Sequence, residues 1–266
     1  MILTAPRLLA VGTHHKTGTL WMRAVFRRLA GRLDLPEHAV YPRTPRAKVD
    51  PGRSRALLTS WSSRFPDWLL GRPDARILHL IRDPRDVLLS GMRYHLHAGE
   101  RGEQFLHEAR DDLDGRTYQQ HLNALEGDVA RLRFEMAEKH AETLAEMRAW
   151  DYGRPNVVEA RYEALMADTE GRLFREHLRD LGLPEAEVDA GVAIFWEQSL
   201  FGGLADPAAR AERVAAHVAS GRVAQWRERL PRPIAEDYAE RHGDDLVALG
   251  YEDHPTAWLS EVRHAA

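Results

Sequence analysis

The sequence has no cysteine among its 266 residues. This absence excludes disulfides, thiolate catalysis and cysteine-ligated zinc. The sequence also lacks an apolar run of the roughly 18 residues that a membrane span requires. Its first residues, MILTAPRLLAVG, do not combine a basic start, a full apolar core and a small-residue cleavage site, as a signal peptide does. We therefore expect a soluble, cytoplasmic protein without a membrane span.

Basic charge is not in excess either. The formal net charge is -4 at pH 7 and the pI is about 6.4, so we expect no nucleic-acid partner. The histidines and carboxylates show no metal-ligand spacing, so we expect no metal. Lysine is scarce, because only Lys16, Lys48 and Lys139 among the 37 basic residues are lysines. Lys16 lies between glycine and hydroxyl residues in THHKTGTLW, which makes it a candidate functional residue.

Short apolar runs alternate with helical patterns along the chain. A hydrophobic content of 44% over this length suffices for one large α/β domain, which we expect to span residues 1–266. Strands separated by helices predict right-handed crossovers and a parallel sheet with helices on both faces. The expected strands are 8–12, 56–61, 75–83 and 157–160; the expected helices are 19–33, 84–97, 117–150, 169–183, 184–198 and 231–251; and the expected loops are 36–55 and a mobile surface segment, 99–115.

Two polar segments follow expected strands at the edge of the sheet where ligands bind in such folds. They are THHKTGT, after residues 8–12, and RDPRDVLLS, at the end of 75–83. In the first, Gly18 allows close approach of the backbone, and the N–H groups at a helix start attract an anion. Thr17 and Thr19 add hydroxyl donors and Lys16 adds a mobile charge. This set suits a phosphate, although a threonine N-cap beside a solvated lysine is the simpler structural interpretation.

A nucleotide triphosphatase loop, G-x-x-x-x-G-K-[ST], is the competing interpretation of THHKTGT. The order of residues differs, because Lys16 precedes Gly18 instead of following it. The hydroxyl that would hold magnesium is therefore misplaced. The nearest candidate for the apolar run that ends in aspartate is ILHLIRD, which an arginine interrupts. An ATP-dependent kinase is disfavoured and stays an alternative.

The segment HKTGTLW resembles the 5′-phosphosulfate-binding loop of the PAPS-dependent sulfotransferase family, which reads approximately P-K-S-G-T-T-W. Lys16, Gly18, Thr19 and Trp21 match directly, and Thr17 matches conservatively. PAPS is 3′-phosphoadenosine 5′-phosphosulfate, which carries phosphate at both ends of the ribose. The resemblance implies a P-loop-like three-layer α/β/α fold with a central parallel sheet.

RDPRDVLLS resembles the 3′-phosphate motif of the same family, R-N-P-x-D-x-x-x-S. Arg82, Pro84, Asp86 and Ser90 fall in register. Two such motifs, each at an expected strand-to-helix junction, are stronger evidence than either alone.

Three later segments extend the resemblance. ARYEAL is similar to a family segment whose tyrosine lies near the adenine, and SLFGGL is similar to another that reaches the adenine. SGRVAQW is similar to the C-terminal segment that covers the 3′-phosphate, but Ala219 and Ser220 stand where the family has a basic pair. The cofactor-binding residues that the resemblance implies are Lys16, Thr17, Gly18, Thr19, Leu20, Trp21, Arg82, Ser90, Tyr162, Ser199, Gly221 and Arg222, the last as a replacement for the missing charge.

The resemblance implies transfer of a sulfuryl group from PAPS to a hydroxyl or amine of a small-molecule, lipid or carbohydrate acceptor. The oligomeric state is left open. The alternatives are a P-loop kinase-like phosphotransferase and a non-catalytic nucleotide-binding module. Lys16 is the expected catalytic residue at the leaving oxygen, because lysine offers a compact charge with rotatable donors. Trp61, Phe65 and Trp68 are candidates to line the acceptor pocket.

The general base is a separate question. Many members of the family place a histidine after a strand, and Trp61 stands near that place here. Histidine suits proton transfer by its pKa, and His14, His15, His95 and His97 lie near the two motifs. We expect His14 to be the base because it follows a strand end and should face the cleft.

Overall fold

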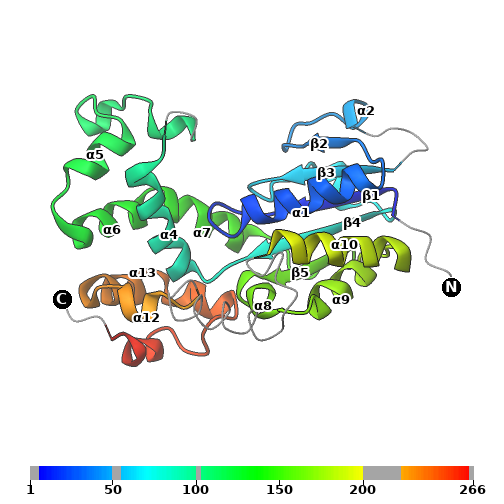
Figure 1. Cartoon of the computed structure of the whole chain (residues 1–266). Helices are drawn as coiled ribbons and strands as arrows, with labels where there is room; N and C mark the ends of the chain where they lie inside the picture. The colour runs from blue at the N-terminus through cyan, green and yellow to red at the C-terminus, as the bar shows by residue number, and fades with distance from the viewer. Residues whose placement is uncertain (1–5, 50–54, 100–102, 200–222, 264–266) are drawn as a thin grey trace. The chain divides into compact units, whose positions relative to one another are not determined.

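The computed structural model describes residues 6–49, 55–99, 103–199 and 223–263 (Figure 1). The chain divides into two compact units, Met1–Arg82 with Ala149–Val223, and Asp83–Arg148 with Ala224–Ala266. A single domain over residues 1–266 stays a prediction. Among the described residues, no helix is both long and apolar enough to cross a membrane.

The first unit is built on a parallel β-sheet. Within the described residues the sheet has five strands in the order β2-β3-β1-β4-β5, and each pair of neighbours is parallel. The α/β fold class with a central parallel sheet is therefore confirmed. The elements of this unit are β1 (Leu8–Gly12), α1 (Thr19–Arg32), β2 (Glu37–Ala39), α2 (Arg46–Val49), β3 (Ala56–Ser60), α3 (Asp67–Leu70), β4 (Ala75–Ile81), β5 (Val157–Arg161), α8 (Tyr162–Ala167), α9 (Arg172–Asp180) and α10 (Glu185–Gln198).

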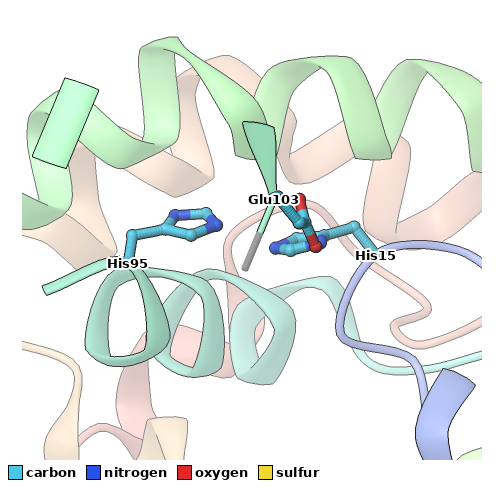
Figure 2. A group of neighbouring side chains, drawn as sticks. All are labelled: His15, His95 and Glu103. Carbon is cyan, nitrogen blue, oxygen red and sulfur yellow. The ribbon is translucent and has the colours of Figure 1, made fainter. Parts of the chain in front are cut away.

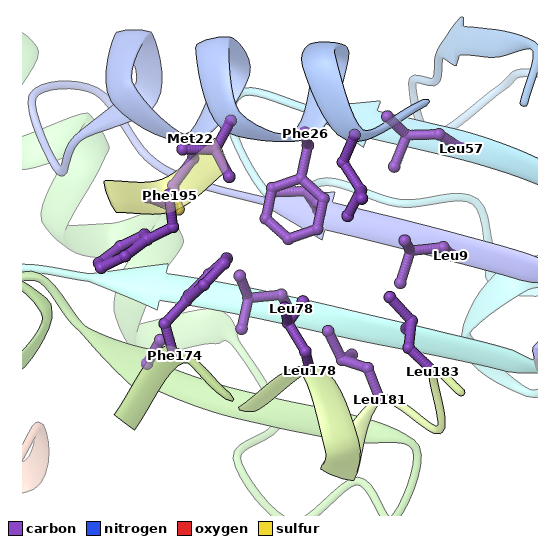
Figure 3. Close-up of a cluster of buried hydrophobic side chains, with 14 of the residues drawn as sticks. Leu9, Met22, Phe26, Leu57, Leu78, Phe174, Leu178, Leu181, Leu183 and Phe195 are labelled. Atoms are coloured by element: carbon purple, nitrogen blue, oxygen red, sulfur yellow. The ribbon is translucent and has the colours of Figure 1, made fainter. Parts of the chain in front are cut away.

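Both faces of this sheet are covered, which explains why its central strands are apolar throughout. On one face, alternate residues of β1, β3 and β4 pack against α1, α9 and α10; Figure 3 shows Leu9 and Leu78 of this core with Phe26, Phe174 and Phe195 from the helices. The intervening residues of β1, β3 and β4 point to the other face of the sheet, where they pack against the segments that carry α2 and α3. Successive side chains of a strand point to opposite faces, so each apolar run supplies both cores.

The expected loop 36–55 was only partly correct, because it contains the edge strand β2 and the short helix α2. β2 pairs with β3 alone, and its three residues, Glu37, His38 and Ala39, are half-buried or exposed. A three-residue edge strand of this composition has no apolar alternation, so the hydrophobic pattern gives no signal for it.

The strand order creates a switch point between β1 and β4. After β1 the chain passes through α1 to β2, on the side of β3, whereas β5 lies on the other side of β4. Connections that leave neighbouring strands in opposite directions open a crevice at their carboxyl ends. Residues 13–18 and Arg82 follow these two strand ends.

The second unit is helical within the described residues. Its core joins α4, α5, α6, α12 and α13, and includes Tyr118, Trp226, Tyr238 and Trp258. Its elements are α4 (Pro84–His97), the 3-10 turns η1 (Gln104–Leu106) and η2 (Asp111–Leu113), α5 (Tyr118–Ala124), α6 (Gly127–Ala137), α7 (Lys139–Ala149), α12 (Trp226–Arg229), α13 (Arg232–Ala248) and η3 (Ala257–Glu261).

Two expectations for this unit need correction. The helical pattern over 117–150 is three helices, because Gly127 has φ 75° and Glu138 leaves helical geometry at φ −105° and ψ −111°. The expected mobile surface segment, where it is described from residue 103, forms η1 and η2 and buries Leu106 and Leu113. Each of these leucines lies among charged residues in the sequence. The average polarity of the segment therefore did not predict that it is anchored by buried side chains.

Candidate active site

The loop between β1 and α1 holds its backbone in an anion-binding conformation. Lys16 has φ 61° and Gly18 has φ 107°, both in the left-handed region. Where right-handed and left-handed backbone conformations alternate along a chain, successive backbone N–H groups point toward one spot and can bind an anion there. Gly18 is the N-cap of α1 and offers no side-chain hydrogen bond, so the positive end of the helix is available for an anion.

The threonines of this loop tie it to itself. The hydroxyls of Thr17 and Thr19 each donate to the carbonyl oxygen of His14 at 2.9 Å, and the backbone N–H of His14 donates to Thr17 Oγ1 at 2.9 Å. Thr13 Oγ1 and Thr19 Oγ1 lie 2.8 Å apart. These bonds stabilise the loop, so an anion here would be held mainly by backbone N–H groups and Lys16.

Two other residues of the predicted loop contribute differently. Leu20 is 78% exposed. The group of Leu20 that suits the predicted binding of an anion is therefore its backbone N–H, in the first turn of α1. Trp21 is half-buried and packs against Phe195 and Tyr162, with ring centroids 5.1 Å and 6.1 Å away. Trp21 thus anchors α1 in the core of the first unit.

Arg82 and Tyr162 lie together beside this loop. Arg82 is buried, and its Nη1 donates to the carbonyl oxygen of Lys16 at 3.2 Å. Its guanidinium carbon lies 4.5 Å from the centroid of the Tyr162 ring, a cation–π contact. Tyr162 follows β5 directly, as the first residue of α8. Three segments that are far apart in the sequence therefore meet at the carboxyl ends of β1, β4 and β5.

The side chain of His14 does not face a cleft. It is fully buried, and its Nε2 lies 2.9 Å from Nε2 of His79, on β4. Burial and the neighbouring His79 hold the pKa of His14 well below its usual range. His79 Nδ1 in turn lies 2.6 Å from Oε2 of Glu159, on β5. The sequence analysis did not single out His79 or Glu159, although each is a polar residue two positions before the end of a strand.

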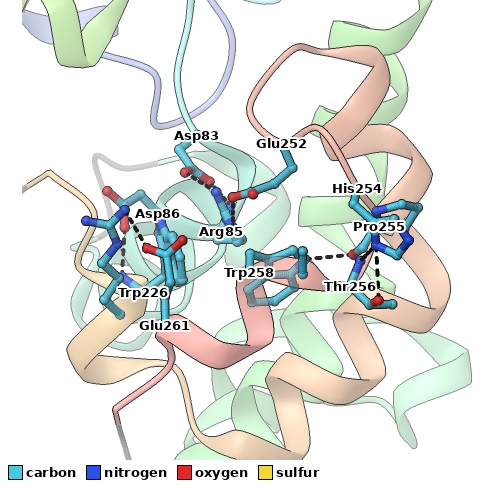
Figure 4. Close-up of polar contacts among 12 residues, drawn as sticks. Asp83, Arg85, Asp86, Trp226, Glu252, His254, Pro255, Thr256, Trp258 and Glu261 are labelled. Atoms are coloured by element: carbon cyan, nitrogen blue, oxygen red, sulfur yellow. Dashed lines mark hydrogen bonds and ion pairs between the residues drawn. The ribbon is translucent and has the colours of Figure 1, made fainter.

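The second unit contains the start of α4, with Asp83, Arg85, Asp86 and Ser90. Asp83 caps the helix by accepting the N–H of Arg85 at 3.0 Å. Arg85 is buried, pairs with Asp83 and Glu252 at 2.8 Å and 2.6 Å, and lies over the ring of Trp226 (Figure 4). Arg85 therefore stabilises the fold here, while Ser90, two turns into the helix, is half-buried.

Asp86 anchors the C-terminal segment of the second unit. Its Oδ1 accepts the backbone N–H of Trp226 at 3.0 Å, and Trp226 itself is fully buried. Gly221 and Arg222 lie outside the described residues. Trp226 is the first residue of α12, so this hydrogen bond joins the start of α12 to the start of α4.

The other histidine candidates have different surroundings. His95 is buried on α4 (Figure 2), and its Nδ1 lies 2.7 Å from Glu135 Oε2, which also accepts the hydroxyl of Tyr118 at 2.7 Å. Burial, and after it this carboxylate, raise the pKa of Tyr118. His97 is exposed and His15 is half-buried. His95 therefore belongs to a buried hydrogen-bond network of the helical unit.

The remaining candidates also have structural partners. Ser199 follows α10, and its hydroxyl donates to the carbonyl oxygen of Trp196 at 2.7 Å. Trp68 Nε1 donates to the carbonyl oxygen of Thr44 at 2.8 Å. Phe65 is buried with its ring 6.1 Å from that of Trp150, and Trp61 is half-buried.

No family model and no curated protein matches the sequence. The structure of the chain, by contrast, is similar to several solved structures. Mouse sulfotransferase SULT7A1 complexed with PAP is 18% identical, with 75% of this chain and 67% of that chain covered and a TM-score of 0.40. Retinol dehydratase in complex with androsterone and inactive cofactor PAP is 14% identical, with 80% and 71% covered and a TM-score of 0.38. A sulfotransferase from Alicyclobacillus acidocaldarius is 17% identical, with 81% and 96% covered and a TM-score of 0.33. The chain is thus similar to solved sulfotransferase structures.

Proposed function

We propose that this protein is a sulfotransferase that moves a sulfuryl group from PAPS to a hydroxyl or amine of a small-molecule, lipid or carbohydrate acceptor in the cytoplasm. One observation carries the proposal: Lys16, Arg82 and Tyr162, taken from three separate motifs, meet around the loop of residues 13–18. A strand-to-helix loop with an open helix N-terminus, a lysine and a buried arginine suits an anionic donor that carries two phosphate groups.

The chemistry is an in-line displacement at sulfur. A bond forms between the acceptor oxygen or nitrogen and sulfur, the bond from sulfur to the 5′-phosphate oxygen breaks, and the acceptor loses a proton. Negative charge grows on the leaving phosphate oxygen, so donors that are already in place there lower the barrier. Lys16 Nζ would bridge the leaving oxygen and the sulfuryl group, while the N–H groups of residues 18 to 21 would hold the 5′-phosphate.

The 3′-phosphate would be bound by Arg82, and the adenine would lie near Tyr162 and Ser199. The parts of Ser90, Gly221 and Arg222 in binding stay predictions from the sequence. Because Arg82 also bonds the Lys16 carbonyl, an anion on Arg82 would fix the backbone at the catalytic lysine. The predicted general base, His14, is fully buried, so the proposal assigns it no contact with the acceptor. The proposal includes no metal.

Binding of the product PAP (3′-phosphoadenosine 5′-phosphate), measured by calorimetry against ATP, tests the donor site. We expect PAP to bind at least tenfold more tightly than ATP, and Lys16→Ala to weaken PAP binding. Lys48→Ala is the matched control, because Lys48 is exposed on α2 in the same unit. Preference for ATP would replace this proposal with a kinase-like phosphotransferase, and PAP binding without turnover would indicate a non-catalytic module.

The Lys16→Arg variant separates binding from catalysis. Arginine keeps the charge but not the compact ammonium with rotatable donors. We expect most turnover to be lost while PAP affinity is largely retained. Near-normal turnover in Lys16→Arg would remove Lys16 from the leaving oxygen.

A further inference from the structure

The segment that follows β3 packs tightly against the end of β1. A Cβ added to Gly12 would lie 2.7 Å from Oγ of Ser63 and 2.8 Å from Cε2 of Phe65. Neither distance leaves room for a methyl group, so glycine at position 12 lets both side chains lie where they do. The close fit brings the segment after β3 to the start of the loop of residues 13–18, within the first unit.

Thr13, the first residue of that loop, is held to this segment by both of its backbone polar groups. Its N–H donates to the carbonyl oxygen of Ser60 at 3.1 Å, and its carbonyl oxygen accepts the hydroxyl of Ser63 at 3.1 Å. Thr13 and Ser63 are both buried. Because a buried carbonyl that loses its hydrogen bond is costly, the Ser63 hydroxyl stabilises the position of Thr13.

The backbone conformation of Ser63 does not by itself call for serine. Ser63 has φ 52°, in the left-handed region that few residues other than glycine adopt. Such strain persists only where the surrounding structure holds it. Glycine would adopt this conformation with less strain, but it would leave the Thr13 carbonyl without the hydroxyl. The side chain of Ser63 is therefore the part that a function at this position would use.

A second hydrogen bond carries the restraint from Thr13 to α1. The hydroxyl of Thr19 donates its hydrogen to the carbonyl oxygen of His14 at 2.9 Å. A hydroxyl has a single hydrogen, so across the 2.8 Å contact between the two threonine hydroxyls Thr13 is the donor and Thr19 the acceptor. Thr19 is the first residue of α1. Ser63 thus holds Thr13 by its backbone, and Thr13 holds the start of the helix by its side chain.

We propose that Ser63 is a positioning residue for the sulfuryl transfer. Through Thr13 it fixes the end of β1 relative to the first turn of α1, whose N–H groups would hold the 5′-phosphate. In this role Ser63 acts only through the loop and is not itself a catalytic residue. The role rests on the proposed function, in which a small displacement of the phosphate relative to Lys16 would slow in-line transfer.

The variants Ser63→Gly and Ser63→Ala test this role together. Both lack the hydroxyl, but glycine adopts the left-handed conformation more readily, so Ser63→Gly should have a higher urea midpoint than Ser63→Ala. We expect both to bind PAP about three- to tenfold more weakly in calorimetry, as loss of one hydrogen bond implies. Both should also lower kcat about tenfold or more, whichever is more stable. Ser62→Ala removes a neighbouring hydroxyl from the same segment and is the control that should keep PAP affinity and kcat.

An NMR spectrum of nitrogen-15-labelled protein tests the positioning without a donor. We expect Ser63→Gly to shift the backbone amide resonances of residues 18–21, and Ser62→Ala to leave them in place. Three results would overturn the role: wild-type PAP affinity and kcat in both Ser63 variants, unshifted amide resonances of residues 18–21 in Ser63→Gly, or a loss of PAP affinity in Ser63→Ala alone. A wild type that neither binds PAP nor transfers a sulfuryl group refutes the proposed function and with it this role, and that failure is visible before any Ser63 variant is measured.

Discussion

Replacing Gly18 by alanine perturbs the loop at its most constrained residue. Gly18 has φ 107°, and an added Cβ would lie 3.0 Å from Cδ2 of the Tyr162 ring and 3.2 Å from Cδ2 of Leu80. Backbone strain of this kind is worth about 1–3 kcal/mol. The contact also pushes on the ring that supports Arg82, whose guanidinium bonds the Lys16 carbonyl. The substitution should therefore weaken both the fold and the donor site.

We expect Gly18→Ala to lower the free energy of unfolding by about 1–3 kcal/mol in urea denaturation. If half of this strain, about 0.5–1.5 kcal/mol, is relieved by moving Tyr162 and Arg82, PAP affinity should fall about two- to tenfold, since 1.4 kcal/mol corresponds to a factor of ten. Gly31→Ala is the matched control on the same helix, because an added Cβ there meets nothing within 4 Å. That change should stabilise the protein by up to about 1 kcal/mol through helix propensity. Wild-type stability and PAP affinity in Gly18→Ala would refute the reasoning.

Three further predictions concern single contacts. Arg82→Ala should weaken PAP binding about tenfold or more in calorimetry, because a charge-assisted bond contributes roughly 1.5–3 kcal/mol; unchanged affinity would remove Arg82 from the site. Asp86→Ala should lower the free energy of unfolding by about 1–3 kcal/mol, because the buried N–H of Trp226 loses its acceptor; urea denaturation with no change would contradict this. Because the pKa of His14 is lowered in the folded state, stability is fully present above about pH 6.5 and should be lost as the pH falls, by about 1.4 kcal/mol per unit for each excess proton bound by the unfolded chain. Denaturation from pH 7.5 to 5.5 should show this slope reduced in His14→Phe, and an equal slope would contradict it.

The long apolar strands and the start of α1 were predictable from the sequence. β1, β3, β4 and β5 lie where apolar runs end in turn residues or charged residues, and α1 begins at Thr19 as expected. These signals are local, because the spacing of apolar residues that distinguishes a strand from a helix is visible within a few consecutive residues. The placement of Lys16 near Arg82 followed from one topological rule, that parallel strands bring their carboxyl ends to the same edge.

His14 was expected to face the cleft, whereas its side chain is buried against His79, and the cause is simple. Gly12 and His14 are two residues apart and therefore share a face of the sheet, which buries His14 against His79. The contact of His79 with Glu159 depends on the register between β4 and β5, which are separated by 75 residues of chain between Ile81 and Val157. A register of this kind is set by the packing of both sheet faces, so no short segment of sequence contains it.

Transfer of a radiolabelled sulfuryl group from PAPS to a panel of hydroxyl and amine acceptors tests the central claim most directly. The panel should include small molecules, lipids and carbohydrates, and the wild type should be compared with Lys16→Ala and with the exposed-lysine control Lys48→Ala. We predict labelled product from the wild type and from Lys48→Ala, and little or none from Lys16→Ala. Two results would contradict the claim that this loop catalyses sulfuryl transfer. The label stays on PAPS with every acceptor, or Lys16→Ala transfers the label as fast as the wild type.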